Sequence, residues 1–279
     1  MIFQDDPFTD FTFWDAIESG LYYVIVGYYF LIFAYFLLMR YRTSKKYFWL
    51  YFSILFLCLA ASRVFFIMYY FYTPELSPTI SDPELVGILM VQYRLATLST
   101  WFGIASLMGV LGILIFPPIT ETEGITEKVD KKFFKKKNAR ISFKFLLIII
   151  PIIIGILALI LPDSLFMDPD FVAKYSADPP DLIFGIYPTG RAILNFILLP
   201  LFVAIIPFLF ISLAIRTFGV LRRSYALNAI GFLIYFMGRI LQGVFNTLGW
   251  YHVEAVAPPL LILLSLLIIV IANNYEQLR

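Results

Sequence analysis

The chain of 279 residues is 61% hydrophobic and only 14% charged, with a net charge of +2 at neutral pH. A soluble domain carries about 25% charged residues, so this composition and its long apolar runs exclude a soluble globular protein. The single cysteine, Cys58, excludes a disulfide within the chain. The acidic, aromatic segment at residues 3–15 lacks the basic start of a cleavable signal peptide.

Seven apolar segments follow one another along the chain, each close to the roughly 20 residues that a membrane helix needs. They are Leu21–Met39, Phe48–Tyr72, Gln92–Phe116, Phe145–Leu161, Ala192–Ile215, Leu227–Trp250 and Ala255–Ile271. We therefore expect an all-α polytopic membrane protein, a seven-transmembrane-helix bundle that forms one domain over residues 1–279. The fourth segment has no polar side chain, so we expect it to face lipid or to serve as a spacer.

Lysine and arginine gather in the loops on one side of the predicted bundle. Loop 40–47 holds four of them, loop 117–144 holds eight and loop 216–226 holds three. The segments on the other side contain thirteen acidic residues and one clear loop lysine, Lys174. Because positive residues stay on the cytoplasmic side, the N-terminus is predicted outside and the C-terminus inside. We expect a multi-pass protein of the plasma membrane.

The same basic loops indicate the partners. Each cation near the surface attracts anionic membrane lipid by about 1 kcal/mol, so lipid is the first partner we expect. Loops 40–47, 117–144 and 216–226 are also where a cytoplasmic signalling protein would dock. No nucleic-acid partner is expected.

An internal repeat is predicted from a shift of 176 residues, which places Arg40 on Arg216 and Arg63 on Arg239 without a gap. The halves would cover about 15–116 and 191–273, with a linker helix at about 143–161. With one linking helix, the two halves are parallel, related by an axis along the membrane normal.

The 3+1+3 layout, the outside N-terminus and the final ANNYEQLR support a resemblance at the level of topology. They resemble microbial rhodopsins, sugar-translocating SWEET-type proteins and the seven-helix sensor regions of prokaryotic histidine kinases. A retinal protein carries a lysine in its last span, and Ala255–Ile271 has none. The first two spans also lack the prolines of a SWEET-type carrier. The resemblance implies a sensor-like bundle and assigns no role to any residue.

Several kinds of chemistry are missing from the sequence. One histidine, His252, is too few for a haem held by paired histidines. The spans lack the ligand set of a zinc hydrolase and carry no acid well inside them, which argues against an aspartyl protease and a carboxylate proton relay. We therefore expect no enzyme activity, no metal site and no cofactor.

Four arginines are predicted to lie in the outer half of the membrane. A rise of about 1.5 Å per residue from the basic loops places Arg63 and Arg239 about 24–25 Å into a core of about 30 Å. Arg94 and Arg191 start the third and fifth spans. An arginine at such depth is costly and usually marks a function or a built-in ion pair. The candidate ligand-binding residues are Arg63, Arg94, Thr97, Trp101, Arg191, Asn195, Tyr235, Arg239, Gln242, Asn246, His252 and Glu254.

Two structural alternatives compete with ligand binding. Arg94 and Arg191 could extend to the lipid headgroups, and Glu254, Asp15 or Glu18 could neutralise individual arginines. Because four arginines outnumber the carboxylates expected at their depth, we expect surplus positive charge suited to a carboxylate or phosphate.

Three functions follow from this interpretation. The first is a receptor or sensor that binds a small anionic ligand or an acidic headgroup in an outer-facing arginine-rich cavity. The second is a secondary carrier of an organic anion, and the third is a structural accessory subunit of a membrane complex. A dead-ended cavity favours the sensor and a continuous passage the carrier, whereas a cavity filled by Glu254 and Asp15 favours the structural subunit.

Overall fold

The structure is a computed structural model that describes residues 11–115, 137–167, 172, 174, 181–183 and 187–274. Residues 1–10, the tail at 275–279 and residues 117–136 of the predicted basic loop 117–144 lie outside it, whereas residues 137–144 of that loop are helical. The described part contains seven helices long and apolar enough to cross a membrane. This confirms the all-α, seven-helix polytopic topology. The predicted orientation, the internal repeat and the identity of the membrane stay predictions.

The elements follow in chain order, and some membrane helices include a short π-helical segment. The first membrane helices comprise α1 (Phe13–Ala34) with η1 (Tyr35–Tyr41) and α2 (Arg42–Ser44), α3 (Tyr47–Ile67) with η2 (Met68–Tyr72), η3 (Pro74–Leu76), α4 (Asp82–Ile115) and α5 (Lys137–Ile160). The later elements are η4 (Asp163–Leu165), β1 (Leu182–Ile183), β2 (Tyr187–Pro188), α7 (Thr189–Arg191), η5 (Ala192–Leu198), α8 (Leu199–Arg216), α9 (Gly219–Thr247) and α10 (Tyr251–Asn274).

Most membrane helices are longer than the apolar segments that predict them, because hydropathy marks the lipid-facing length and not the helix end. At the start of α1, Asp15 N donates to Thr12 Oγ1 over 3.3 Å, and Thr12 N donates to Asp15 Oδ2 over 2.7 Å. This reciprocal capping box starts the helix at Phe13, ahead of the predicted Leu21. Similarly, α4 begins at Asp82, so Arg94 lies three turns inside the helix and not at its start.

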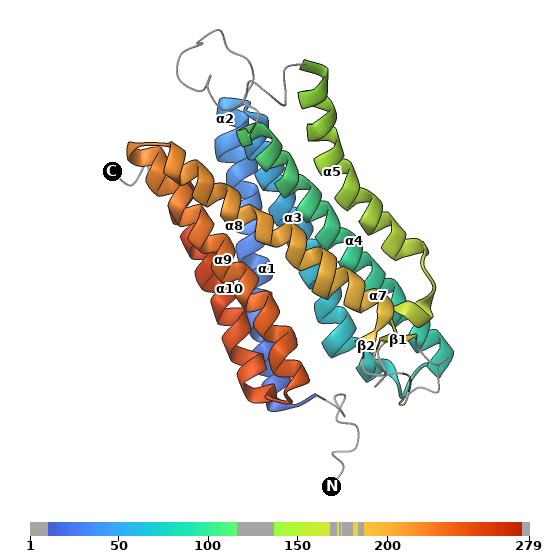
Figure 1. Cartoon of the computed structure of the whole chain (residues 1–279). Helices are drawn as coiled ribbons and strands as arrows, with labels where there is room; N and C mark the ends of the chain where they lie inside the picture. Colours follow the sequence, from blue (N-terminus) through green and yellow to red (C-terminus); the bar gives the residue numbers. More distant parts are fainter. Residues whose placement is uncertain are drawn as a thin grey trace.

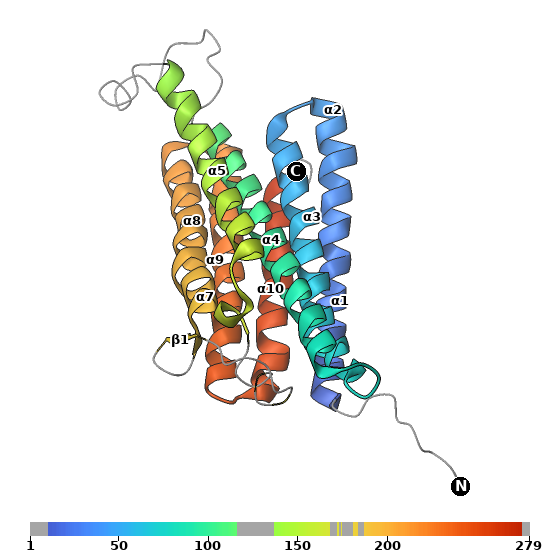
Figure 2. The ribbon, with the colours of Figure 1, turned by 90° about the vertical axis from the view of Figure 1, so that its right-hand side faces the viewer.

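The helices form two groups that meet along the molecule (Figures 1 and 2). In the first, α1 packs on α3, α3 on α4 and α4 on α5; in the second, α8 packs on α9 and α9 on α10. Extensive packing of α1 on α10 joins the groups, while α4 and α8 touch over a shorter stretch. We call the end where α1 and α10 begin the rim end and the opposite end the base end. The β1–β2 hairpin lies at the rim end.

Small residues allow close helix packing, as two contacts illustrate. A Cβ added at Gly231 would lie 2.7 Å from Ile269 Cγ1, so α9 and α10 approach each other closely at that level. Between α4 and α5, a Cβ at Gly155 would lie 3.0 Å from the Cβ of Trp101. Small residues let membrane helices come into direct backbone contact, where van der Waals packing holds them. The far side of α5 exposes apolar side chains such as Ile160, as expected for a lipid-facing helix.

An aromatic core joins the two groups towards the base end. The Phe52 ring of α3 lies 6.5 Å from the Phe232 ring of α9, and Phe232 stacks on Phe210 of α8 at 5.6 Å. Phe36 of η1 packs on Phe52 at 5.5 Å. The rings therefore fill the space between α1, α3, α8 and α9 at this depth.

A hydrogen-bonded cluster, which we call the base network, lies beyond these rings. Arg40 of η1 donates to the Asn273 carbonyl at 3.0 Å, to Asn274 Oδ1 at 2.9 Å and to the Tyr35 hydroxyl at 3.0 Å. Asn273 Nδ2 donates to Asn228 Oδ1 at 3.0 Å. These five residues tie α9 and the end of α10 to η1.

Candidate functional site

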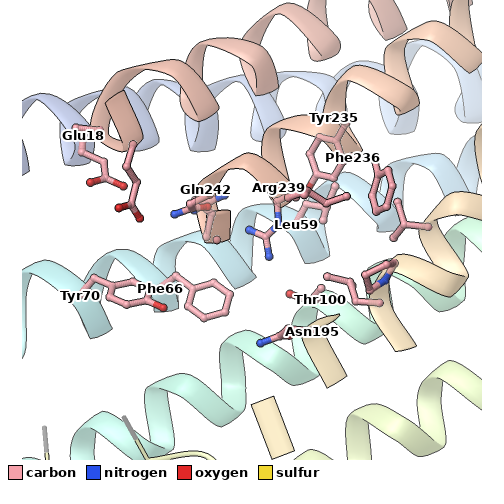
Figure 3. Close-up of a pocket in the computed structure, with 18 of the residues that line it drawn as sticks. Glu18, Leu59, Phe66, Tyr70, Thr100, Asn195, Tyr235, Phe236, Arg239 and Gln242 are labelled. Atoms are coloured by element: carbon pink, nitrogen blue, oxygen red, sulfur yellow. The ribbon is translucent and has the colours of Figure 1, made fainter. Parts of the chain in front are cut away.

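A cavity of about 700 Å³ lies between the two helix groups. It extends from the rim end to the aromatic core, and its size is typical of small-molecule sites. Figure 3 shows it lined by side chains from both groups, with Glu18 and Arg239 pointing into the same space. The charged and amide residues of its lining are Asp15, Glu18, Arg63, Arg191, Asn195, Arg239, Gln242, His252 and Glu254.

Two of the predicted arginines, Arg63 and Arg239, line the cavity without a hydrogen bond to a described residue. Arg63 of α3 is the more buried of the two. Only 5% of the residue is exposed, and its guanidinium carbon lies 4.1 Å from the centre of the Tyr22 ring. This stacking on an aromatic face provides favourable cation–π energy without neutralising the charge. Within the described residues, Arg63 makes no hydrogen bond and no ion pair within 4.0 Å.

Arg239 of α9 lines the same cavity as Arg63. Both side chains also line a second space of about 10 Å³, together with Tyr29 and Tyr235. The Tyr29 hydroxyl donates to the Tyr235 hydroxyl at 3.4 Å, which links α1 to α9 beside the two arginines. Like Arg63, Arg239 is without a hydrogen bond or ion pair to any described residue.

Arg191 has a different role, although it also lines the cavity. It is only 3% exposed, and it donates to the Phe166 carbonyl and to the Tyr69 hydroxyl. Its guanidinium carbon lies 4.3 Å from the centre of the Tyr93 ring, and Tyr93 in turn accepts a hydrogen bond from Asn195 at 3.1 Å. Arg191 thus ties the start of the α7–η5–α8 helix to η2, α4 and the segment after η4.

Three carboxylates line the cavity together with the three guanidiniums. Asp15 uses one oxygen in the capping box of α1, Glu18 points into the cavity (Figure 3), and Glu254 at the start of α10 is 9% exposed. The predicted surplus of positive charge is therefore not found among the described lining residues. The structure instead places equal numbers of acidic and basic groups around one space.

Arg94, Thr97 and Trp101 are not part of the cavity lining. Arg94 forms an ion pair with Asp163 at 2.6 Å and donates to the carbonyls of Leu159 and Leu161. A cation at the last carbonyls of a helix is a favourable cap, so Arg94 fixes the end of α5. Thr97 Oγ1 donates to the Tyr93 carbonyl at 2.9 Å, within its own helix.

Trp101 packs in the core between α4, α5 and α8. Its ring lies 5.7 Å from the ring of Phe202 in an edge-to-face arrangement, and 1% of the residue is exposed. The membrane depth estimated from their positions in the sequence placed Arg94, Thr97 and Trp101 beside Arg63. They differ from it because their helix face points towards α5 and the protein core.

The remaining predicted residues lie towards the rim end. Gln242 and His252 line the cavity, and the exposed His252 ring packs against Trp14 at 4.5 Å. Tyr235 lies deeper, beside Arg239 (Figure 3). The side chain of Asn246 lies outside the described structure.

Sequence analysis named Glu18 only as a possible neutralising group and missed Tyr22 and Thr100. Glu18 and Tyr22 are four residues apart and share a face of α1, which was a detectable signal. Thr100 could not be identified in this way, because its hydrogen bond to Ser62 at 2.6 Å depends on how α4 packs on α3.

The arrangement can bind but offers few groups for bond-breaking chemistry. Within the described residues, there is no group of three or more His, Cys, Asp or Glu side chains that could hold a metal ion. The Cys58 thiol and the His252 imidazole are on different elements, and only His252 lines the cavity. Paired donors for an oxyanion are the clearest chemical feature of the site.

No family model matches this sequence, and no curated protein or solved structure is significantly similar to it. The resemblance to rhodopsin-like proteins and to kinase sensor regions therefore rests on topology alone.

Proposed function

We propose that this protein is a seven-helix receptor or sensor that binds a small organic anion, or an acidic headgroup, in the cavity between the helix groups. The proposal depends on the position of Arg63 and Arg239 in the cavity and on their lack of a direct protein partner. Both face one cavity, and neither makes a hydrogen bond or ion pair with a described residue.

A guanidinium without a direct hydrogen-bonded or ion-paired partner inside a membrane bundle is energetically costly, and it favours an anion that can reach it. The planar donors of arginine suit the two oxygens of a carboxylate or phosphate. Two arginines from opposite helix groups could therefore hold one acidic group between them. By the predicted orientation, the ligand would enter from outside the cell.

The inner part of the cavity favours an apolar portion on the same ligand. Below the arginines, the walls are made by aliphatic and aromatic side chains. They include Leu55, Phe56, Ile104, Leu107, Val203, Phe232, Leu266 and Ile269. Burying an apolar group here contributes about 25 cal/mol for each Å² removed from water, so an acid with an apolar tail should bind better than a bare anion.

Binding at this position would act on the contact between the groups. Arg63 belongs to α3 and Arg239 to α9, so a shared anion favours the arrangement in which these helices are close. A ligand shifts a conformational equilibrium only through such differential contacts. Pro207 in α8 and the Pro258–Pro259 pair in α10 interrupt helix hydrogen bonding next to the site, which supports a bistable element there.

The hydrogen bonds of the base network support a receptor over the carrier alternative. The cavity lining extends to Phe232 and Ile269, four residues before Asn273 of the base network, and none of the five base-network residues belongs to it. A carrier needs a second path to the base end, which would require breaking the Arg40 bonds to α10. The accessory-subunit alternative requires paired arginines, a condition that Arg94 meets and Arg63 does not.

The proposal is tested by thermal unfolding of the purified protein in detergent with a panel of anions. The panel contains 3-phenylpropionate, 4-methylpentanoate, phenyl phosphate and inorganic phosphate. We expect millimolar concentrations of at least one organic anion to raise the unfolding temperature by several degrees, because a ligand that binds the folded state stabilises it. Arg63→Met and Arg239→Met should each abolish this increase. Arg222→Met, which removes an exposed arginine of α9, should retain it.

A lipid source of the anion is distinguished in nanodiscs. Stabilisation that requires phosphatidylglycerol in the disc, and that no soluble anion reproduces, identifies a headgroup as the ligand. A wild-type protein that no anion stabilises in either setting would count against the proposed function.

A further inference from the structure

The acid Glu18 and the arginine Arg63 form an unusual arrangement around Tyr22. Glu18 precedes Tyr22 by four residues on α1, and this spacing places both side chains on one helix face. The Tyr22 ring carries the Arg63 guanidinium at 4.1 Å. The backbone of Glu18 therefore lies about one helical turn, roughly 6 Å, closer to the rim end than that of Tyr22.

These opposite charges are close enough to interact electrostatically, yet they do not contact each other. The described residues contain no ion pair within 4.0 Å that involves Glu18, Arg63 or Arg239. All three side chains line the cavity. An acid and two bases thus border the same space with a gap between them.

A gap of this kind is suited to a ligand that carries both charges. We propose that the ligand is a zwitterion whose ammonium group binds Glu18 and whose carboxylate binds Arg63 and Arg239. This inference rests on the proposed function and deepens it. An ammonium and a carboxylate on one carbon would each meet a group of opposite charge in this cavity.

The other acids of the cavity are less suited to this role. One Asp15 oxygen accepts the Thr12 N–H at 2.7 Å and the Thr12 hydroxyl at 2.6 Å, so it is committed to the helix cap. Glu254 lies at the start of α10 and is almost completely buried. Glu18 is half-buried and its carboxylate points into the cavity (Figure 3).

The apolar chamber below the arginines defines the rest of the ligand. With the ammonium towards the rim end and the carboxylate at the arginines, a side chain attached to the same carbon extends towards Leu107, Val203 and Ile269. The chemical class is therefore an α-amino acid, or a close analogue, with an apolar or aromatic side chain. A larger peptide would have to leave its charged ends outside this arrangement.

The test compares ligands that differ by one charged group. Phenylalanine, 3-phenylpropionate and phenethylamine share a skeleton, and leucine, 4-methylpentanoate and isopentylamine form a second set. Affinities for the detergent-solubilised full-length protein are measured by calorimetry and by thermal shift. In at least one set, we expect the zwitterion to bind at least tenfold more tightly than the acid, and the amine not to bind.

Glu18→Gln separates this inference from the proposed function. The variant should remove the advantage of phenylalanine or leucine and leave the affinity for the matching acid within about twofold, because the amide keeps the shape and loses the charge. Arg63→Met should abolish binding of both the zwitterion and the acid. Glu84→Gln, which removes an exposed acid at the start of α4, should bind like the wild type.

The outcomes distinguish the two proposals. If the acids bind as well as their zwitterions, or if Glu18→Gln keeps the zwitterion advantage, the zwitterion inference is wrong and the anion receptor stands. If neither acids nor zwitterions bind, the zwitterion inference is wrong, and the anion receptor is then decided by the remaining anions and the nanodisc experiment. Whether zwitterions bind more tightly than the matching acids is measured on the wild-type protein alone. This test therefore does not depend on the folding of any variant.

Discussion

The cavity and the base network contain the same kinds of residue in opposite states. In the base network, Arg40 makes three hydrogen bonds, and tyrosine and asparagine side chains provide two of their acceptors. In the cavity, Arg63 and Arg239 lie among Tyr22, Tyr29 and Tyr235 and bond to none of the described residues. Both regions lie between membrane helices, so the difference is one of geometry and not of composition.

The comparison teaches that a polar residue within a membrane bundle can serve either stability or binding. Arg40 satisfies protein acceptors and ties η1 to the end of α10, which makes it part of the folded structure. Arg63 leaves its donors to the cavity and contributes little that the fold needs. We therefore expect substitutions of the two arginines to separate stability from ligand binding. Without ligand, Arg63→Met should unfold at the same temperature as the wild type. This variant is the reference for the next three predictions.

The largest loss of stability is expected for Arg191→Met, which tests whether a cavity-lining arginine can belong to the stability class. The substitution leaves the buried Phe166 carbonyl and the Tyr69 hydroxyl without this donor. Each unsatisfied buried group costs about 1–3 kcal/mol, so we expect a loss of about 3 kcal/mol. Unfolding in mixed detergent micelles measures it. Stability equal to that of Arg63→Met would place Arg191 with the binding residues.

A smaller loss is expected for Arg40→Met in the base network. The variant loses the bonds to Asn273, Asn274 and Tyr35, but these groups lie near the base end, where water can replace part of the interaction. We expect about 2 kcal/mol by the same unfolding measurement, with unchanged affinity for the anion in calorimetry. If Arg40→Met kept the stability of the wild type and no longer bound the anion, Arg40 would belong to the binding residues and not to the stabilising ones.

The smallest effect is expected for Asp163→Asn. This acid pairs with Arg94 at 2.6 Å, but its side chain is 54% exposed, and exposed ion pairs contribute between about 0 and 1 kcal/mol. Arg94 also keeps its bonds to the carbonyls of Leu159 and Leu161. Thermal unfolding should therefore shift by less than in Arg40→Met. A loss as large as that of Arg191→Met would show that the ion pair, and not the carbonyl bonds, holds α5.

The number and order of the membrane helices could be predicted from the sequence. Each of the seven apolar segments corresponds to a described membrane helix, because a run of about 20 apolar residues has no other stable place in a bilayer. Helix ends were less accurate, as at α1 and α4, because capping residues extend helices beyond the apolar run. The basic residues of loop 117–136 lie outside the described residues and add nothing to this comparison.

The candidate site could be predicted only in part. Depth along the helices was enough to associate Arg63 with Arg239, and the structure brings both to one cavity. The same reasoning grouped Arg94 with them, although Arg94 faces the end of α5. Depth is a property of one helix, whereas direction depends on how that helix is rotated against its neighbours. Small residues such as Gly155 and Gly231 contribute to that rotation through tertiary packing.

The sequence by itself determined that this chain has seven segments able to cross a membrane and that several of them carry arginines. Apolar length and charge are local quantities, so they can be read along the chain. Tertiary structure alone decided which guanidiniums are satisfied by protein groups and which face a cavity. It also decided that Glu18 lies across a gap from Arg63. Hydrogen bonds and gaps between helices depend on the relative positions of residues that are far apart in the chain, and no single segment specifies them.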